Sequence, residues 1–414
     1  MNSKKNAFYA QSGGVTAVIN ASACGVIETV AKSKKINKVL CGQNGILGAL
    51  NENLIDTSKE SKSTIAKLKN TPGGAFGSCR FKLQDPIAQK KDYDRLFEVF
   101  AAHDIGYFFY NGGGDSQDTT YKISEMAKKL KFPIQCIGVP KTIDNDLPFT
   151  DCSPGFGSVA KYVATSTLEA GLDVKSMAET STKVFILEVM GRHAGWIAAS
   201  SCLAATKAGD PPHIILLPEV PFEKSKFISQ VKQMVKQNGY CVIVASEGAQ
   251  TKNGRFLADS GLTDAFGHKQ LGGVAPVLAS MISKIGLKNH WAVADYLQRS
   301  ARHISSKTDL DQAYAVGAHA VKLALAGKTA IMPIIKRLSD SPYKWKIETA
   351  PLKNVANVEK TMPKKFISLS GFEITAAGKK YLSPLIQGEA PTKYVNGMPD
   401  VAVLKKIMIK KKIT

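Results

Sequence analysis

Short apolar runs alternate with longer segments of helical periodicity along this chain, and this alternation restricts its fold more than any other feature. The apolar runs that predict strands lie at residues 7–11, 38–42, 107–110, 134–139, 183–189, 213–217 and 241–245. Helix-like segments between them include residues 16–31, 93–103, 116–130, 194–206 and 222–237. Strands that are apolar on both faces and separated by helices predict parallel sheets covered on each side. We therefore expect an α/β fold of two doubly wound lobes with mainly parallel sheets.

The length of the chain also favours two lobes. It has 414 residues, and 44% of them are apolar, which is typical of a globular protein with two cores. We place the boundary near residue 155. Residues 1–155, with a returning helix within residues 305–330, would form the first lobe, and residues 156–304 the second. Residues 331–414 read as a C-terminal extension of mixed strands and turns, and their sequence indicates no role.

The residues that follow the predicted strands are rich in glycine and in charged side chains. The sequence SGGVTAVINA follows the first strand, NGGGDSQDTT the third, PKTIDNDLPF the fourth, MGRHAGW the fifth and SEGAQTKNG the seventh. Ligands of doubly wound sheets bind at the carboxyl ends of the strands. We therefore expect these strand exits to converge on one active site.

Two of the exits form glycine-rich turns before a predicted helix. In the first, Gly13 and Gly14 would present bare backbone amides at a helix N-terminus, which suits a phosphate group, although a plain tight turn fits equally well. The second turn adds Asp115. Its carboxylate can hold a hydrated Mg²⁺ against phosphate oxygens, or Asp115 or Ser116 can simply cap the helix.

The fourth exit is the hardest to explain as a simple turn. It contains Lys141, Asp144, Asn145 and Asp146 within six positions, where a turn needs one Asp or Asn. Carboxylates this close repel each other, so we expect one of them to have a raised pKa and to act as a proton acceptor beside the lysine. A structural capping role is the less favoured alternative.

The remaining exits and one loop add cations and a carboxylate. Arg192 follows a strand and a glycine, so its guanidinium can grip phosphate oxygens, and Arg80 ends a glycine-rich loop that suggests a second phosphate contact. Glu247 can accept hydrogen bonds from a sugar or cap a turn. We expect Tyr296 and Arg299 to end a further strand, where Arg299 would offer one more cation.

These parts together are those that phosphoryl transfer needs, because its barrier falls mainly through positioning and charge neutralisation. The histidine of MGRHAGW, His193, fits a packing or capping role better than a catalytic one.

The composition restricts partners and compartment. Lys and Arg exceed Asp and Glu by 55 − 34 = 21, so the surface should attract anions. A basic nucleic-acid-binding protein is the remote alternative, but the aromatic residues fall mostly inside apolar runs, and we expect no nucleic-acid partner. The seven cysteines form no C-x-x-C pair, which favours a reducing cytoplasm. The chain has no apolar run of membrane-spanning length, so we expect no membrane partner.

Six motifs, in their order and spacing, resemble the phosphofructokinase family and in particular its pyrophosphate-dependent branch. They are SGGVTAVINA, GGAFGSCRF, GGGDS, PKTIDND, EVMGRHAGW and SEG, and the similarity runs from about residue 7 to residue 327. The resemblance implies two Rossmann-like lobes, a homodimer or homotetramer, and Mg²⁺ as cofactor. It also implies that fructose 6-phosphate reacts with a phosphoryl donor to give fructose 1,6-bisphosphate.

The resemblance further implies roles on the sugar side. Asp144 would take the proton from the 1-hydroxyl of the sugar, while Thr142 and Asp146 line the same loop. Lys183 stands where many relatives have an arginine that a neighbouring subunit supplies; the lysine keeps the charge and loses the fork. The contacts to the sugar phosphate would come from Met190, Gly191, Arg192, Glu247, Tyr296 and Arg299.

On the donor side, Gly14 and Arg80 match the family's positions. Relatives that use ATP carry glycines where this chain has Lys141 and Asp115, which with Asp144 are the candidate catalytic residues. Asp115 would put a like charge where the nucleotide needs room, and Lys141 can reach a pyrophosphate oxygen. The resemblance therefore favours pyrophosphate as donor, and an ATP-dependent 6-phosphofructokinase is the alternative.

One departure from the family pattern concerns the metal. The usual sequence is GGDDS, and this chain has Gly114 in place of the first aspartate, which is normally a metal contact. We expect either that Asp115 takes over the Mg²⁺ or that the donor and waters mainly hold it.

Overall fold

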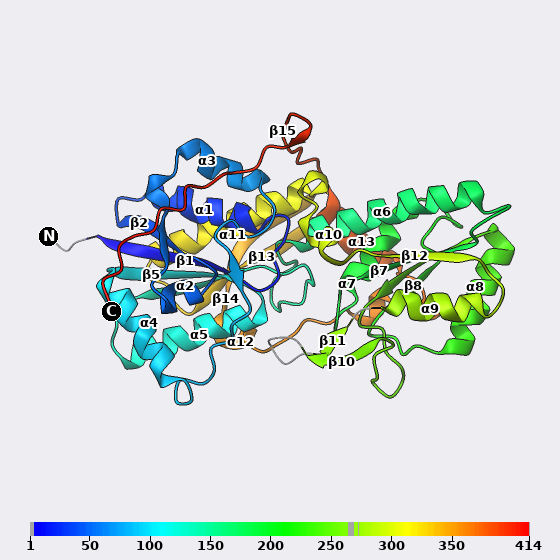
Figure 1. Ribbon diagram of the computed structural model, residues 1–414, viewed down its shortest axis with the longest axis horizontal. Coiled ribbons are helices and arrows are strands. Elements are labelled where there is room, and N and C mark those ends of the chain that lie inside the picture. The colour runs from blue at the N-terminus through cyan, green and yellow to red at the C-terminus, as the bar shows by residue number, and fades with distance from the viewer. Residues whose placement is uncertain (1–3, 264–268, 272, 414) are drawn as a thin grey trace.

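Two α/β lobes lie side by side in the computed structural model, which describes residues 4–263, 269–271 and 273–413 (Figure 1). The first lobe contains the strands β1 (Lys5–Ser12), β2 (Ile36–Gly42), β3 (Leu54–Asp56), β4 (Ser78–Cys79), β5 (Ile105–Gly112), β6 (Gln135–Pro140), β13 (Ile331–Asp340) and β14 (Tyr343–Pro351). They form one sheet in the order β14-β13-β6-β5-β1-β2-β3, with β4 paired to β1. The pairings are parallel except for β2 with β3 and β13 with β14.

The second lobe is built on a smaller sheet that is parallel throughout. Its strands are β7 (Val184–Val189), β8 (Ile214–Leu216), β9 (Cys241–Ser246) and β12 (Asn289–Val293), in the order β12-β7-β9-β8. Two antiparallel pairs lie outside the sheets: β10 (Asp259–Thr263) with β11 (Lys269–Leu271), and β15 (Tyr394–Val395) with β16 (Met398–Pro399). The prediction of a two-lobed, mainly parallel α/β fold is confirmed.

Helices cover both faces of the first sheet. They are α1 (Ile19–Ala31), α2 (Leu47–Leu50), α3 (Lys62–Lys67), α4 (Lys90–Ala102), α5 (Gly114–Lys129), α11 (Lys307–Leu325) and α12 (Leu352–Val355). Side chains alternate along β1, so Ala7 and Tyr9 pack with α1 and α11, while Phe8 and Ala10 pack with α4 and α5. This double covering explains why the strands read as unbroken apolar runs.

The second lobe repeats this arrangement. Its helices are α6 (Phe156–Met177), α7 (Trp196–Ser200), α8 (Lys224–Asn238), α9 (Val274–Ser283), α10 (Asp295–Ser300) and α13 (Ala376–Leu382). Leu187 and Val189 of β7 face α6 and α7, whereas Val184 and Ile186 face α8 and α9. Short 3-10 helices lie at Thr57–Lys59, Leu68–Asn70, Ser201–Ala204, Arg302–Ile304, Lys364–Phe366 and Ser383–Ile386. None of the helices described above is both long and apolar enough to span a membrane.

All seven strands predicted from apolar runs are present, and two other expectations need correction. Tyr296 and Arg299 do not end a strand: β12 stops at Val293 and both residues lie in helix α10. The segment predicted as a helix at residues 194–206 is shorter, because α7 ends at Ser200 and continues only as a 3-10 turn. The division of the chain near residue 155 stays a prediction.

The C-terminal extension joins both lobes instead of standing apart. Its strands β13 and β14 extend the first sheet beside β6, and α13 packs in the second lobe. The chain then returns along the first lobe, where Ile55 bridges to Met408 and the buried carboxylate of Glu52 accepts the backbone N–H groups of Lys412 and Ile413. Figure 1 shows this last stretch in red along the outer edge of the first lobe.

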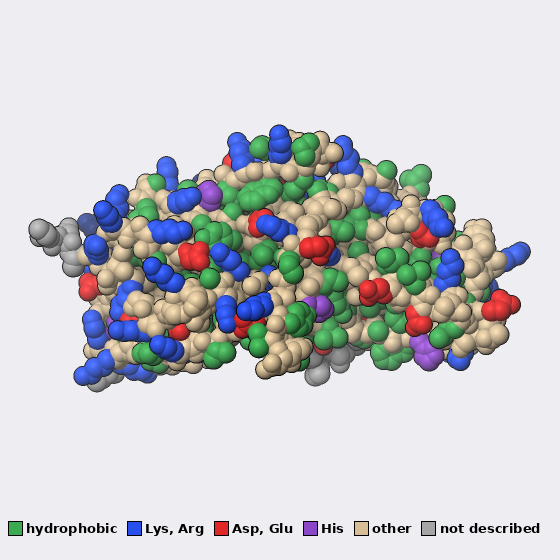
Figure 2. Space-filling model, turned by 90° about the horizontal axis from the view of Figure 1, so that it is seen from above, with side chains coloured by type: hydrophobic (Ala, Val, Ile, Leu, Met, Phe, Trp, Pro, Cys, Tyr) green, Lys and Arg blue, Asp and Glu red, His purple; other side chains and the backbone are tan. Residues whose placement is uncertain are grey.

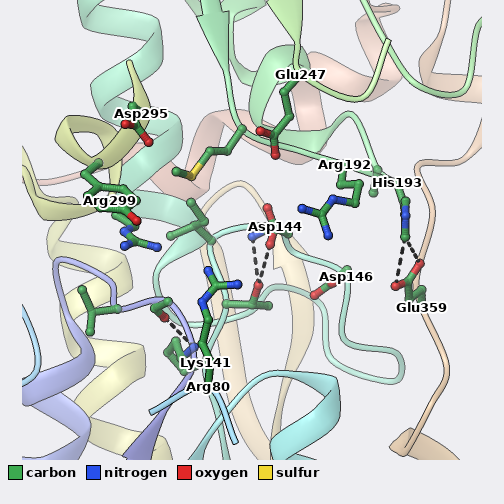
Figure 3. A pocket seen from close by; sticks show the side chains of 17 residues that line it. Arg80, Lys141, Asp144, Asp146, Arg192, His193, Glu247, Asp295, Arg299 and Glu359 are labelled. Atoms are coloured by element: carbon green, nitrogen blue, oxygen red, sulfur yellow. Dashed lines mark hydrogen bonds and ion pairs between the residues drawn. The ribbon is translucent and has the colours of Figure 1, made fainter. Parts of the chain in front are cut away.

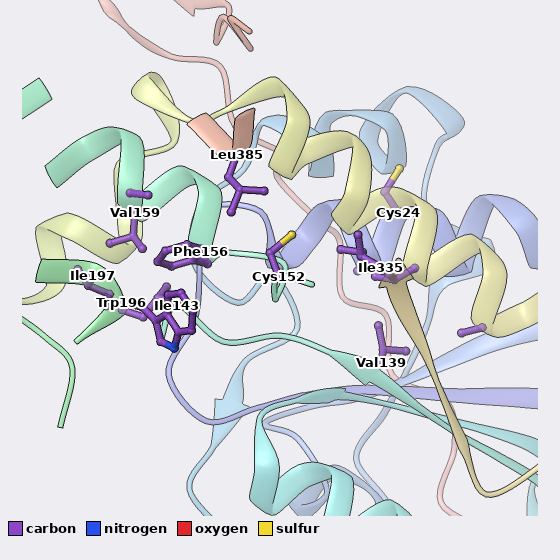
Figure 4. Packing of buried hydrophobic residues seen from close by; sticks show 14 of the residues in the cluster. Cys24, Val139, Ile143, Cys152, Phe156, Val159, Trp196, Ile197, Ile335 and Leu385 are labelled. Carbon is purple, nitrogen blue, oxygen red and sulfur yellow. The ribbon is translucent and has the colours of Figure 1, made fainter. Parts of the chain in front are cut away.

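One apolar core continues from the first lobe into the second (Figure 4). Within this core, Phe156 at the start of α6 meets Trp196 of α7, with ring centroids 6.4 Å apart. Asp309 of α11, in the first lobe, holds the start of α6, since its carboxylate accepts the N–H groups of Gly155 and Ser158 at 2.8 and 2.9 Å. The two lobes are therefore joined by direct hydrogen bonds as well as by the shared core.

The positive charge is unevenly spread over the face of the molecule that Figure 2 shows. Lys and Arg side chains lie more densely over the first lobe, at the left of the face seen from above, than over the second (Figure 2). This distribution favours approach of anions to the first lobe.

Candidate active site

A cavity of about 550 Å³ lies between the two lobes, and the glycine-rich and charged strand exits lead into it (Figure 3). The first lobe lines it with Gly14, Val15, Arg80, Lys141, Thr142, Ile143, Asp144 and Asp146, and the second with Met190, Arg192, His193, Ala194, Glu247, Asp295, Tyr296 and Arg299. Glu359 of the C-terminal extension completes the lining. The site residues predicted from sequence that do not line this cavity are Asp115, Lys183 and Gly191.

The turn after β6 brings two carboxyl groups into the cavity. Thr142 holds the first of them, because its Oγ1 donates to Asp144 Oδ2 at 3.3 Å and accepts the Asp144 N–H at 3.1 Å. Asn145 follows with a φ of 55°, a left-handed conformation that Asn adopts more readily than most residues. As a result Asp144 lies near the centre of the cavity and Asp146 lies toward His193 and Glu359 (Figure 3).

The pKa values of the ionisable groups in this turn are shifted in the direction that favours their neutral forms. Burial raises the pKa of Asp144, and the carboxylate of Glu247 adds to the rise, whereas Lys141 and Arg192 oppose it. Burial, with help from Asp144, also raises the pKa of Asp146 to about 7. Burial lowers the pKa of Lys141 to about 8. A carboxyl group with a raised pKa, surrounded by cations, is suited to accept a proton at neutral pH.

Lys141 joins this turn to the glycine turn after β1. Its Nζ is buried and donates to the carbonyl oxygen of Gly14 at 2.6 Å. A Cβ at position 14 would lie 2.6 Å from Nη1 of Arg299, so the glycine leaves room for that guanidinium. Arg80 rises from the first lobe beside Lys141 toward Asp144 (Figure 3). Lys141 and Arg80 therefore form the first-lobe side of the cavity, and Arg299 reaches the glycine turn from the second lobe.

Helix α10 carries Arg299, the cation that was predicted to lie at the end of a strand. The guanidinium of Arg299 stacks on the ring of Tyr296, with the Arg299 Cζ 3.9 Å from the ring centroid. Asp295 begins the same helix, also lines the cavity and has a φ of 34°. Sequence reasoning missed Asp295, because it follows no motif and its strained backbone is visible only in three dimensions.

The exit of β7 and the exit of β9 meet at the second-lobe side. The Gly191 N–H donates to Glu247 Oε1 at 3.3 Å, and Gly191 has a φ of 128°. A Cβ at Gly191 would lie 2.8 Å from the carbonyl oxygen of Ala194, so a side chain is excluded by both conformation and space. Gly191 thus shapes the loop that carries Arg192 although it does not line the cavity. Burial raises the pKa of Glu247.

An ion pair that the sequence did not indicate stands at the edge of the cavity. His193 Nδ1 lies 3.0 and 3.2 Å from the two carboxylate oxygens of Glu359, and hydrogen bonding to Glu359 raises the pKa of His193. His193 was expected to pack or to cap a helix; its imidazole instead links the second lobe to Glu359 of the C-terminal extension. Glu359 lies in the C-terminal extension, far from the motifs, and no local pattern marks it.

A second cavity, of about 510 Å³, adjoins the first at Asp146 and Glu359, which line both. Asp115 lies here, at the start of α5, where its carboxylate pairs with Lys82 Nζ at 2.7 Å. That hydrogen bond raises the pKa of Lys82. The family resemblance assigned both Asp115 and Lys141 to the choice of donor, and the structure places them in two adjoining cavities.

The carboxylates near this junction fit a sparsely coordinated magnesium ion. Within the described residues, no group of three or more His, Cys, Asp or Glu side chains is arranged to hold a metal. Mg²⁺ usually binds through one or two carboxylates together with substrate phosphates and waters. The partly exposed carboxylate of Asp115, facing a cavity that continues into the first, suits this mode, while Gly114 offers no ligand side chain.

Lys183 lies at the opposite end of β7 from the cavity. Its ammonium donates to the carbonyl oxygens of Ala178 and Glu179, the latter at 3.2 Å. It therefore does not reach the cavity of its own chain, and its expected service to a neighbouring subunit stays a prediction.

Comparisons with known proteins agree with this architecture. The model of the family described as Phosphofructokinase matches residues 6–324. The chain is 62% identical over 410 residues to a pyrophosphate–fructose 6-phosphate 1-phosphotransferase of Halomonas elongata, which covers 99% of this chain and 98% of that protein. It also resembles solved pyrophosphate-dependent phosphofructokinases from Marinobacter aquaeolei (TM-score 0.91, 60% identical, 99% of this chain and 98% of that one) and Nitrosospira multiformis (0.92, 56%, 99% of each). This chain belongs to the phosphofructokinase family.

Proposed function

We propose that this protein transfers a phosphoryl group reversibly from pyrophosphate to the 1-hydroxyl of fructose 6-phosphate, giving fructose 1,6-bisphosphate and phosphate. The observation that carries the proposal is the half-buried carboxyl group of Asp144, which lies in one cavity with cations from both lobes. Two sets of cations flanking a base suit two phosphorylated ligands whose reacting atoms meet between them. The printed names of the relatives from Halomonas and Marinobacter agree with this reaction.

Asp144 acts as the base in this proposal. Its carboxylate accepts the proton of the sugar 1-hydroxyl while that oxygen attacks the terminal phosphorus of pyrophosphate. The bond from that phosphorus to the bridging oxygen breaks, and phosphate leaves. The raised pKa of Asp144 makes it a stronger base than an exposed aspartate, and in the reverse direction the same group returns the proton.

The second lobe binds the sugar phosphate. Arg192 and Arg299 supply charge for the phosphate, and Glu247 accepts hydrogen bonds from sugar hydroxyls. These roles rest on the family resemblance and on the presence of all three side chains in the same cavity. The remaining candidates on this side are Thr142, Met190, Gly191 and Tyr296, of which Gly191 acts through the shape of its loop.

The first lobe binds the donor. Lys141 and Arg80 neutralise pyrophosphate oxygens, and Gly14 lines the cavity beside them. The pair of Lys82 with Asp115 supports pyrophosphate over ATP, because a nucleotide extending into the second cavity would meet the Asp115 carboxylate and would have to displace its partner.

Mg²⁺ is the divalent cation we infer for this reaction. Asp115 would hold it together with donor oxygens and water, and the ion would neutralise the charge of the donor phosphates. The chain itself supplies the base and the other cations.

A second copy of the chain is the partner we infer, in a homodimer or homotetramer. Apolar side chains are exposed along α6, β12 and α10: Leu172 is 58% exposed, Trp291 47% and Leu297 65%. β12 is an edge strand of its sheet, and α10 packs against α6, so the second lobe offers exposed apolar side chains to a partner at and near this edge. Lys183 bonds to the segment just before β12, which places it next to this surface and supports its service to a neighbouring site.

The cytoplasm is the compartment we infer. All seven cysteines are buried as free thiols, which suits a reducing environment.

The experiment that tests the proposal compares the two possible phosphoryl donors. Purified protein would be assayed with fructose 6-phosphate and either Mg-pyrophosphate or Mg-ATP at equal free Mg²⁺, with coupled detection of fructose 1,6-bisphosphate. We expect turnover with pyrophosphate to exceed turnover with ATP by at least about tenfold. Turnover with ATP alone would overturn the donor assignment, and no turnover with either would overturn the reaction.

A further inference from the structure

The C-terminal extension passes from one lobe to the other directly beside the active site. We call residues 357–362 the crossing segment; it follows α12, and its orange trace leads from that helix toward the second lobe in Figure 1. At one end Asn357 Nδ2 donates to Asp118 Oδ1 of α5 at 3.1 Å. At the other end the Met362 N–H donates to Glu219 Oε1 in the second lobe at 3.2 Å. The crossing segment is therefore tied to both lobes.

Lys360 of the crossing segment lies behind the turn that carries the base. Its Nζ donates to Asn145 Oδ1 at 3.3 Å and to the carbonyl oxygens of Thr150 and Asp151, both at 3.1 Å. Its backbone N–H donates to the Asp146 carbonyl oxygen at 2.6 Å. An ammonium group has three protons, so the three acceptors satisfy it completely. Lys360 thus holds the turn by its side chain and its main chain together.

The residue that Lys360 grips is the one that sets the direction of the turn. Asn145 is fully buried, adopts a left-handed conformation and stands between Asp144 and Asp146. A non-glycine residue in this conformation is stable only where its surroundings hold it. Asn145 Oδ1 also accepts the Ser153 N–H at 3.0 Å, and its Nδ2 donates to Tyr381 Oη at 3.0 Å. The side chain of Asn145 is thus clamped from both ends.

The chemistry at Lys360 is unusual for a purely structural contact. All three acceptors of its ammonium are neutral oxygens, and burial lowers the pKa of Lys360 to about 8. The ammonium also lies 5.4 Å from the ring centroid of Trp196. A partly buried charge that is held by neutral oxygens stabilises a fold less than one paired with a carboxylate, and the segment that these hydrogen bonds fix is the turn that carries Asp144.

We propose that Lys360 is a positioning residue for phosphoryl transfer, which fixes Asn145 and thereby the direction in which Asp144 points into the cavity. This inference rests on the proposed function, because it takes Asp144 as the base. If the base is displaced by about an ångström, the rate of the chemical step falls strongly, while substrate binding is largely kept. The extension, whose role the sequence did not indicate, thereby becomes part of the catalytic apparatus.

The test compares Lys360→Met with the matched control Lys365→Met in the full-length protein. Lys365 is exposed, lies near the same segment and contacts the ring of Phe366. We expect Lys360→Met to lower kcat about 10- to 100-fold while KM for both substrates changes less than about threefold, and Lys365→Met to change neither. Unchanged kcat in Lys360→Met would overturn the proposal. If that variant does not fold, Lys360→Gln is measured in its place with the same criterion.

A double-substitution cycle with Asp144→Asn separates positioning from general support of the fold. If Lys360 acts through Asp144, Lys360→Met should cost less than about twofold in kcat when Asp144 is already Asn. A full second loss in that background would overturn the proposal. The cycle also distinguishes the two levels of inference. Wild-type turnover in Asp144→Asn alone would remove the base assignment, whereas loss in Asp144→Asn together with normal kcat in Lys360→Met would remove only the role of Lys360.

Discussion

The turn that follows β6 has two faces, and their chemistry differs. The front presents Asp144 and Asp146 to the cavity, and burial raises the pKa of both carboxyl groups. The back presents Asp151 to the C-terminal extension, where the Arg337 Nε donates to both oxygens of its carboxylate at 3.0 and 2.9 Å. The carboxyl groups of Asp144 and Asp146 stay available for chemistry at a cost in stability, whereas the paired carboxylate of Asp151 contributes stability. The segment after β6 thus carries catalytic groups on the side of the cavity and a stabilising ion pair on the side of the C-terminal extension.

The largest effect is expected on the front. Asp144→Asn should lower kcat by at least about a hundredfold, the usual scale for loss of a general base. The midpoint of urea unfolding should not fall, because the substitution removes a buried group that burial disfavours in its charged form. Steady-state kinetics and urea titration of the same preparation measure both. A clear fall in the urea midpoint of Asp144→Asn would show that the Asp144 carboxyl group stabilises the fold, which contradicts this comparison.

The reverse result is expected on the back. Arg337→Met leaves the Asp151 carboxylate, 13% exposed, without its main partner and should lower the free energy of unfolding by about 3 kcal/mol. The kcat of the folded protein should stay within about threefold, because the Asp151 N–H still donates to the Ile335 carbonyl oxygen at 2.8 Å. Lys336→Met, on the same strand and exposed, is the control. A large kcat loss without destabilisation would contradict the division between the faces.

Donor choice tests the two cavities in front of the turn. Asp115→Gly combined with Lys141→Gly should raise the ratio of ATP to pyrophosphate turnover by about tenfold, mainly because turnover with pyrophosphate falls. Parallel assays with each donor give the ratio, and Lys82→Ala shows how much of the effect comes from the partner of Asp115. An unchanged ratio in the double variant would show that Asp115 and Lys141 do not determine which donor the protein uses.

The smallest effect is expected at the pair of His193 with Glu359. Glu359 raises the pKa of His193, so the pair stabilises the native state fully below the pKa of unfolded histidine, about 6.5, and this contribution is lost as pH rises through the higher native value. Both side chains are about half exposed, so the contribution should be about 0.5 kcal/mol. Urea unfolding of His193→Gln at pH 6 and at pH 9 should therefore differ from wild type only at pH 6. An equal difference at both pH values would show that packing outweighs charge here.

Much of the fold could be predicted because the chain is locally consistent. Each doubly covered strand is apolar on both faces, as in Phe8 and Tyr9 of β1, and each is followed by a glycine or charged turn. The same logic predicted which residues line the cavity, because carboxyl ends of parallel strands meet at one edge. Lys141, Asp144, Arg192 and Glu247 all come from such exits.

The rest could not be predicted because it depends on pairing between distant segments. Lys360 and Arg337 reach the turn from about two hundred residues away, as their hydrogen bonds to Asp151 show. Helix α6 escaped the pattern because it is buried along much of its length and lacks a clear polar face. Arg299 was placed at the end of a strand because a strand, β12, does lie just before it, and the short helix α10 that follows is too brief to show a helical period.

The path of the chain through the two sheets has a consequence during synthesis. The second sheet uses strands from one stretch of the chain, β7 to β12, and all of them are translated before β13 and β14. The first sheet begins earlier yet stays incomplete until those two late strands arrive beside β6. We therefore expect the middle of the polypeptide to mature first, while the earliest segment waits, unfinished at its edge, for its last neighbours to be translated.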